Sequence, residues 1–145
     1  MNSGWMQQAQ GFWKTWTPTW TNFTTTSGTV TARYTQIGKT VHCYLKFVAG
    51  ASSAFGTNPT FTVPVTAASH YGSQINTVGV GYTEDLATAG YSFGYQFNAS
   101  TTVISIYTLN AAGTILNFNA NITATSPFTM ASGDFFSVSF TYEAA

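Results

Sequence analysis

Hydrophobic and polar residues alternate with a period of two along most of this chain. Between residues 28 and 48, aliphatic and aromatic residues alternate with Thr, Arg and Lys on both sides of Gly38. This alternation is typical of strands with one buried face, and glycine at the turn can adopt the positive φ that a tight hairpin requires. The pattern therefore predicts one long β-hairpin. The predicted buried face of its second strand consists of Val41, Cys43, Leu45 and Phe47.

Further alternating segments follow at the short, regular spacing of an all-β fold. Pro64 interrupts one of them, which favours an edge position for that strand because proline cannot donate to a sheet ladder. We predict eight or nine strands forming an antiparallel β-sandwich, jelly-roll-like, over residues 18–145. The expected strands outside the hairpin cover residues 16–23, 61–65, 75–82, 91–97, 103–109, 115–122 and 136–142. The predicted core adds Phe61, Val63, Phe136, Val138 and Phe140 to the hairpin face.

Residues 1–17 have a different pattern. Trp5, Phe12, Trp13 and Trp16 recur at helical spacing, which predicts an N-terminal arm with a short helix. A helix this short is marginally stable alone in water, so its aromatic face needs something to pack against. Two interpretations remain open: the arm folds back over its own domain, or it docks on a partner or on sister subunits. The four aromatic residues are the candidate partner-docking residues.

The composition is unusual in its scarcity of charge. Only 6% of the residues are charged, against about 25% in ordinary globular domains, whereas 17% are aromatic. Thr, Ser and Asn together make up about a third of the chain. The formal net charge is zero, and four scattered cations cannot form a nucleic-acid footprint. A neutral, aromatic-rich surface favours self-association, so we expect a homo-oligomer, with a trimer favoured. Neither a membrane-spanning apolar run nor a signal peptide is evident.

Residues that could support catalysis are few and poorly spaced. Glu84 and Asp85 are adjacent, although paired catalytic carboxylates must flank a substrate from separate positions. Asp134 occupies a Ser-Gly-Asp turn, where Asp bonds to its own backbone. His42 and His70 match no metal-binding spacing, and the single Cys43 alternates with core residues. We therefore predict no enzyme activity, no metal site and no cofactor.

Exposed aromatic side chains could instead bind carbohydrate, because sugar rings stack on aromatic faces while Thr, Ser and Asn supply hydrogen bonds. The stripe from Tyr91 to Phe97 has the period of a core face and is predicted to be buried. The residues expected to be exposed are Tyr44, Tyr82, Tyr107, His70 and Tyr71.

Several strand-and-turn motifs resemble a module of bacteriophage tail and minor structural proteins. Trp16-Thr-Pro-Thr-Trp20 precedes Gly28-Thr-Val-Thr-Ala-Arg-Tyr-Thr-Gln-Ile-Gly-Lys-Thr-Val41, and Thr62-Val-Pro-Val-Thr-Ala67 follows. Ala131-Ser-Gly-Asp134 then leads to Thr141-Tyr-Glu-Ala144 at the end of the chain. The resemblance covers residues 16–145. It implies a virion β-sandwich, often trimeric, at a capsid surface, tail tip or fibre, and it carries no catalytic residues.

The sequence thus leads to two functional hypotheses. The first is a structural protein of the virion, assembled in the host cytoplasm and exposed on the particle. In that role it would be a capsid decoration protein or a small tail or fibre subunit that binds itself and the major capsid or tail protein. The alternative is a carbohydrate-binding domain of a phage tail that recognises a host surface glycan as receptor.

Overall fold

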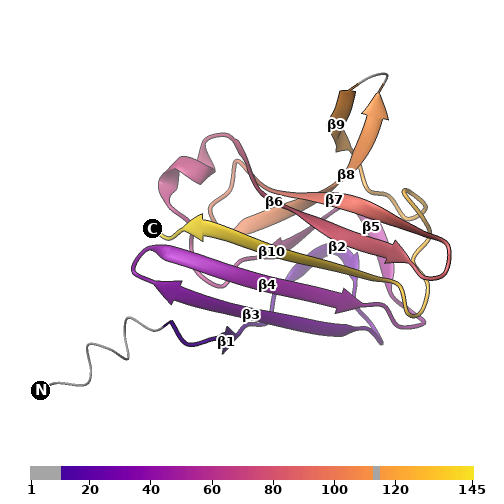
Figure 1. The fold of residues 1–145 in the computed structure, drawn as a ribbon, viewed down its shortest axis with the longest axis horizontal. Coiled ribbons are helices and arrows are strands. Elements are labelled where there is room, and N and C mark those ends of the chain that lie inside the picture. The colour runs from indigo at the N-terminus through magenta and orange to yellow at the C-terminus, as the bar shows by residue number, and fades with distance from the viewer. Residues whose placement is uncertain (1–10, 113–114) are drawn as a thin grey trace, which may run out of the picture.

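Antiparallel strands make up most of the protein in a computed structural model that describes residues 11–112 and 115–145 (Figure 1). One short 3-10 helix, Ser69–Gly72 (η1), interrupts them between β5 and β6. The strands are Lys14–Thr15 (β1), Trp20–Thr24 (β2), Thr29–Ile37 (β3), Thr40–Val48 (β4), Ala54–Thr62 (β5), Ile75–Asp85 (β6), Ala89–Asn98 (β7), Val103–Ala112 (β8), Ile115–Ala120 (β9) and Phe135–Glu143 (β10). No helix in these ranges is long and apolar enough to cross a membrane.

The predicted hairpin is confirmed as β3 and β4. The two strands pair from Thr29 with Val48 to Ile37 with Thr40, so the connecting turn contains only two residues. Gly38 has a φ of 58° in this turn, as the sequence predicted. The alternation is also confirmed, because every second residue of β4 from Val41 to Phe47 is fully buried.

Hydrogen bonds join the strands into one continuous, curled sheet. Its order is β1-β3-β4-β10-β6-β7-β8-β5-β2, with β9 paired to β8, and every pairing is antiparallel. The all-β, antiparallel prediction is therefore confirmed. A jelly-roll sandwich of two separate sheets is not, because the ladder runs without interruption from β1 to β2.

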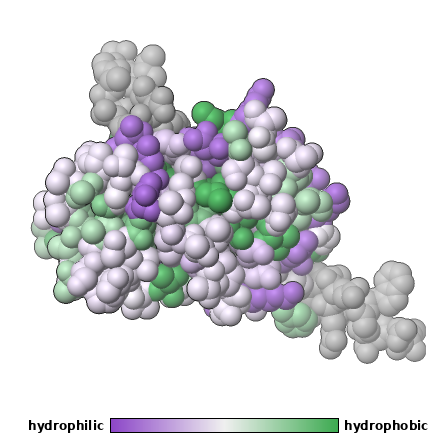
Figure 2. All heavy atoms as spheres, turned by 180° about the vertical axis from the view of Figure 1, so that it is seen from behind, coloured by the Kyte–Doolittle hydropathy of each residue, from purple (hydrophilic) through white to green (hydrophobic). Residues whose placement is uncertain are grey.

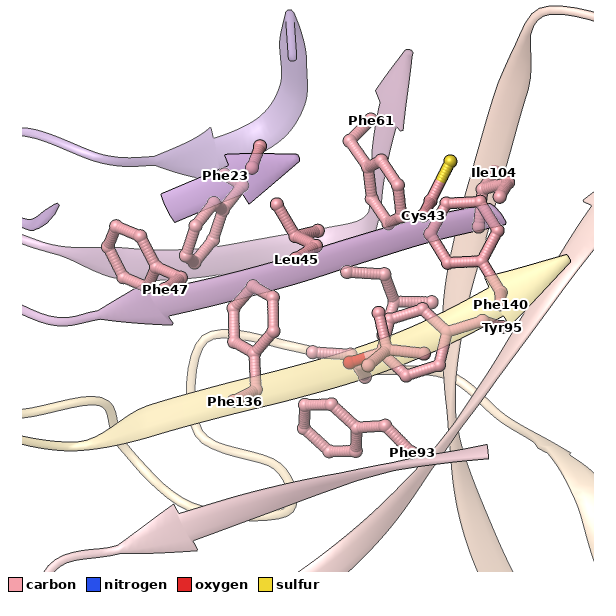
Figure 3. Close-up of a cluster of buried hydrophobic side chains, with 14 of the residues drawn as sticks. Phe23, Cys43, Leu45, Phe47, Phe61, Phe93, Tyr95, Ile104, Phe136 and Phe140 are labelled. Atoms are coloured by element: carbon pink, nitrogen blue, oxygen red, sulfur yellow. The ribbon is translucent and has the colours of Figure 1, made fainter. Parts of the chain in front are cut away.

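The curl brings β2 and β5 over the inner face of β4 and β10, where aromatic rings fill the core (Figure 3). Phe23 of β2 lies 4.8 Å from Phe47 of β4 and 5.7 Å from Phe136 of β10, measured between ring centroids. Since β2 is hydrogen-bonded to neither of those strands, these contacts are packing between opposite parts of the sheet. Buried aromatic pairs of this kind add about 0.5–1.5 kcal/mol each beyond the area they bury.

Of the nine predicted core residues, eight are buried and Val63 is only partly buried. The strand expected over residues 61–65 instead begins at Ala54 and ends at Thr62, so Val63 lies in the loop that follows. Gly56 and Pro59 obscure the alternation in the first half of β5, which explains why the sequence pattern missed it. The aromatic stripe of β7 is confirmed as core for Phe93, Tyr95 and Phe97, which are fully buried, whereas Tyr91 is only partly buried.

The N-terminal segment departs from the predicted helix. Residues 11–17 form no helix, and Lys14 and Thr15 pair with Tyr34 and Arg33 at the edge of the sheet. The Trp16 amide then donates to the Ala32 carbonyl at 3.1 Å. The helical spacing of the aromatic residues was misleading because the edge strand β3 has free backbone N–H and C=O groups. Pairing with that edge is more stable than a short helix without tertiary contacts. The helix prediction is therefore wrong for this part of the arm, and residues 1–10 lie outside the described residues.

Candidate binding surface

One side of the sheet presents side chains to solvent over β3, β4, β10 and β6, the strands in front in Figure 1. We call it the outer face, because its residues alternate with the core residues and so point away from them. The register places Arg33 beside Tyr44, Tyr44 beside Ser139, and Lys46 beside Ser137, which in turn pairs with Tyr82. The outer face includes Arg33, His42, Tyr44, Lys46, Tyr82, Glu84, Phe135, Ser137, Ser139, Thr141 and Glu143.

The cations of the outer face lie against aromatic rings. The Lys46 ammonium is 4.8 Å from the centroid of Phe135, and the Arg33 guanidinium is 5.7 Å from that of Trp13. Among the described residues, which include all four carboxylate side chains, neither cation forms an ion pair. A cation over a ring contributes about 0.5–1 kcal/mol when exposed, and it leaves the positive charge unneutralised.

Tyr82 is the most prominent ring at the β6 end of the outer face, with 47% of its surface exposed. It lies across Gly90 of β7, where an added Cβ would be 2.5 Å from the Tyr82 hydroxyl. That hydroxyl donates to Glu84 Oε2 at 3.2 Å. Desolvation, together with the hydrogen bond and charge of Glu84, raises the pKa of Tyr82 above its ordinary value. The Tyr82 ring can thus lie against the sheet because Gly90 has no side chain, and the Glu84 carboxylate orients its hydroxyl group.

His42 is fixed at the other end of the face. Its Nδ1 is 2.8 Å from Thr141 Oγ1, and its ring meets Trp13 edge-on at 5.6 Å. Trp13 therefore covers one corner of the outer face from the N-terminal segment. Together, Tyr44, Tyr82, Phe135 and Trp13 give this surface rings on four different strands or segments, with hydroxyl groups between them.

A second exposed apolar area lies where the N-terminal segment meets the β3–β4 turn. We call it the arm patch, defined by Phe12, Trp13 and Ile37, which are 62%, 46% and 51% exposed. Gly11 fits closely against Thr35 and Ile37, so the segment is held to β3 before the patch begins. Large apolar side chains with this much contact to solvent are a common property of interaction surfaces.

The four candidate docking residues separate into three groups. Trp16 packs on its own domain: its Nε1 donates to the Thr62 carbonyl at 3.1 Å, and its ring meets Tyr34 at 6.4 Å. Phe12 and Trp13 remain exposed in the arm patch. Trp5 lies outside the described residues. Each of the two interpretations of the arm therefore applies to part of it, with Trp16 folded back and Phe12 and Trp13 open to a partner.

The other aromatic candidates also differ from one another. Tyr82 is exposed and Tyr44 is partly buried on the outer face, whereas Tyr107 is buried and its hydroxyl accepts from Asn98 Nδ2 at 3.0 Å. Tyr71 packs on Phe97 of the core at 4.8 Å, and His70 lies against it. The prediction of exposure is confirmed for Tyr82, and Tyr44 is exposed only in part. It is wrong for Tyr107, because the consecutive residues 104–107 of β8 are all buried and both faces of the strand are therefore covered.

Phe135 is a member of the outer face that sequence reasoning missed. It precedes Phe136, and adjacent residues of a strand point to opposite faces, so one of the two rings had to face outward. The pair of adjacent phenylalanines was therefore the feature of the sequence that could have predicted an exposed ring here. Phe136 is fully buried, whereas Phe135 is partly exposed and touches Lys46 and Tyr82.

The residues considered for catalysis have structural partners. Asp134 is buried, and its two carboxylate oxygens accept from the amides of Leu86 at 2.9 Å and Ala131 at 2.6 Å. Burial raises the pKa of Cys43 to about 12, so the thiolate needed for a nucleophile is disfavoured. Over the part of the chain that the structure describes, no three His, Cys, Asp or Glu residues gather as a metal site would require.

The opposite side of the molecule offers less contrast. Figure 2 shows it as mostly intermediate in hydropathy, with small hydrophobic areas scattered among a few strongly hydrophilic ones. Among the described residues, we therefore take the outer face and the arm patch as the candidate binding surfaces, because both carry exposed aromatic rings.

Comparison with protein-family models, with curated proteins and with solved structures finds no match to this chain.

Proposed function

We propose that the protein is a non-enzymatic structural subunit of a bacteriophage particle, which joins its assembly through the arm patch. The phage origin rests on the resemblance of its strand and turn motifs to virion modules. The assembly role rests on one structural observation: Phe12, Trp13 and Ile37 are all exposed where the N-terminal segment lies against the end of β3, in a chain with very little charge. In this role the protein is a capsid decoration protein or a small tail or fibre subunit, and a trimer is the favoured oligomer.

The arm patch is suited to such a contact for energetic reasons. Burying an aromatic side chain contributes on the order of 2–3 kcal/mol, and Trp is the residue most enriched at interface hot spots. Because β1 is already paired with β3, the segment that carries Phe12 and Trp13 has lost part of its freedom before binding. A partner therefore pays less of the ordering cost that usually opposes docking of a terminal segment.

The proposal is tested with the double variant Phe12→Ser/Trp13→Ser. Sedimentation velocity should show an oligomer for the unaltered protein and a monomer for the variant, with far-UV circular dichroism unchanged. Ile75→Ser is the matched control, because Ile75 is equally exposed at 63% but lies on β6, away from the arm. A protein that stays monomeric with its arm intact, or a double variant that associates as strongly as the control, would contradict the proposal.

A further inference from the structure

Charges of both signs lie together on the outer face. The register places the carboxylates of Glu84 and Glu143 on the same side of the sheet as Arg33 and Lys46. The two cations and two carboxylates cancel formally, so neither an anion nor a cation is favoured by the face as a whole. Such a surface instead offers hydrogen-bond donors and acceptors at short range, which suits a neutral ligand with many hydroxyl groups.

Tyr82 provides a ring laid over the sheet, with one face open to solvent. An added Cβ at Gly90 would be 2.5 Å from the Tyr82 hydroxyl and 2.8 Å from its Cε2 atom, so the ring covers this glycine of β7. Gly90 is the diagonal neighbour of Tyr82, because Glu84 pairs with Gly90 and Tyr82 with Ser92. Aromatic side chains stabilise glycines of neighbouring strands by covering them in this way. The 47% exposure of Tyr82 therefore belongs to a ring whose position is fixed from below.

Hydrogen-bonding groups surround this ring at the spacing of the sheet. Ser137 of β10 is its cross-strand neighbour on one side, and Ser92 of β7 is its neighbour on the other. Directly opposite residues have Cβ atoms about 4.5–5.5 Å apart, a separation that a single sugar ring can bridge. Glu84 Oε2 accepts from the Tyr82 hydroxyl at 3.2 Å, which places the carboxylate beside the ring. Its second oxygen can accept from a ligand.

Phe135 gives the site a side wall. Its ring centroid is 5.8 Å from that of Tyr82, and the two planes meet at 52°, so the rings form an open angle rather than one flat surface. The Lys46 ammonium lies 4.8 Å from the Phe135 centroid and adds N–H donors at this rim. Four strands, β4, β6, β7 and β10, thus contribute an aromatic floor, an aromatic wall, an acceptor and several donors.

We infer that Tyr82, Glu84 and Phe135 form a subsite for one neutral pyranose unit of an oligosaccharide, of the β-glucosyl or β-galactosyl class. The C–H face of the sugar stacks on the open face of Tyr82, because the negative face of an aromatic ring attracts polarised hydrogen atoms. Neighbouring hydroxyl groups of the sugar bond to Glu84 and to the flanking Ser92 or Ser137. An acidic sugar fits less well, since the Glu84 carboxylate repels its charge. The subsite lies outside the arm patch, so the inference goes beyond the assembly role.

An NMR titration of the isotope-labelled full chain tests the inference with two neutral probes, cellopentaose and β1,4-linked galactopentaose. We expect at least one of them to bind at millimolar concentration, with amide shifts concentrated at residues 82–84, 90–92 and 135–137. Sorbitol has hydroxyl groups but no ring face, and it should cause no such shifts. A β1,4-linked oligoglucuronate is the acidic counterpart of cellopentaose and should bind at least about tenfold more weakly than the tighter neutral probe.

Variants of the subsite separate the contributions of ring and carboxylate. Tyr82→Ala should weaken binding of the neutral probe by at least about tenfold, whereas Tyr82→Phe keeps the ring and should retain most of the affinity. Glu84→Gln should weaken binding by about fivefold, the effect of one poorer hydrogen bond. Asp85→Asn is its matched control, because it makes the same change at the next residue, which points to the opposite face of β6. It should bind as the unaltered protein does.

The inference is overturned if neither neutral probe shifts the amides of the subsite, or if the oligoglucuronate binds as tightly as they do. It is also overturned if Tyr82→Phe loses as much affinity as Tyr82→Ala, or if Asp85→Asn weakens binding as much as Glu84→Gln. The Phe12→Ser/Trp13→Ser variant removes two exposed rings outside the subsite and should bind the neutral probe normally. Sugar binding and self-association can therefore fail independently of each other.

Discussion

At the scale of single residues, neighbours along one strand have opposite roles. Phe136 is fully buried among Phe47, Phe55 and Phe93, whereas Phe135 faces outward beneath Lys46. The same residue type thus supports the core at one position and the candidate binding surface at the next.

The Phe135–Phe136 pair gives a matched test of this difference. Phe136→Ala should lower the free energy of unfolding by about 3–5 kcal/mol, because it leaves a cavity in a densely packed aromatic core. Phe135→Ala should cost only about 1 kcal/mol, mainly the contact with Lys46. Urea denaturation of both variants measures the difference. Equal losses would mean that the assignment of the two faces of β10 is wrong.

Two buried tyrosines differ in whether their hydroxyl group has a partner. The Tyr142 hydroxyl donates to the Val65 carbonyl at 2.7 Å and accepts from the Val65 amide at 3.3 Å. The Tyr95 hydroxyl is fully buried and has no hydrogen-bond partner among the described residues. Burial raises the pKa of both side chains above the ordinary value, so both stay protonated at neutral pH.

Removing each hydroxyl should therefore have opposite effects. Tyr142→Phe should lower the free energy of unfolding by about 1 kcal/mol, the net value of a lost hydrogen bond. Tyr95→Phe should raise it by about 1 kcal/mol, because burying an unpaired hydroxyl is unfavourable. Thermal or urea unfolding of the two variants is the measurement, and destabilisation by Tyr95→Phe would show that its hydroxyl does have a partner.

At the scale of elements, the β3–β4 hairpin depends on the backbone of its turn. Gly38 adopts a φ of 58°, and an added Cβ there would meet no atom within 4 Å. Any loss of stability when Gly38 is substituted must therefore come from the backbone conformation and not from a steric clash.

Gly38→Ala is expected to lower the free energy of unfolding by about 1 kcal/mol, since alanine disfavours positive φ. Gly38→Asn should cost less, because asparagine tolerates this conformation. Chemical denaturation of the two variants compares them directly. If both variants lose the same free energy of unfolding, the positive φ at residue 38 does not account for the loss of stability.

The elements also show how far local patterns determine this fold. Strands β3, β4, β7 and β10 were predictable because their inner residues are regularly apolar and their outer residues mostly polar. Residues 11–17 were not, since their helical spacing competes with an edge of β3 that exists only in the folded sheet. The outer face was predicted in part: Tyr44 and Tyr82 followed from alternation, whereas the position of Arg33 beside Trp13 depends on the pairing of β1.

At the scale of the whole molecule, the curl of the sheet is the feature that the sequence left undetermined. A sandwich and a curled sheet use the same alternating strands, and only the hydrogen bonds from β6 through β8 to β5 distinguish them. The curl also positions Thr62, at the end of β5, where its carbonyl can accept from Trp16. The N-terminal segment is consequently attached near both ends of the sheet order, to β3 and to Thr62 at the end of β5.

That attachment divides the arm into a structural part and an exposed part, and truncation should separate them. Deleting residues 1–13 removes Phe12 and Trp13 but leaves β1 and Trp16 in place. The free energy of unfolding should change by less than about 1 kcal/mol, because the side chains of Phe12 and Trp13 are exposed. The same deletion should abolish self-association, since it removes two of the three residues of the arm patch.

Deleting residues 1–16 should have a further effect that the shorter deletion lacks. It removes the half-buried Trp16 ring and its hydrogen bond to Thr62, which together contribute about 2–3 kcal/mol. Urea denaturation and sedimentation velocity on both truncated proteins measure stability and association separately. If the shorter deletion already unfolds the domain, residues 1–13 belong to the fold. If it still associates as the full chain does, the contacts that hold the oligomer lie on another surface, and the outer face becomes the first candidate.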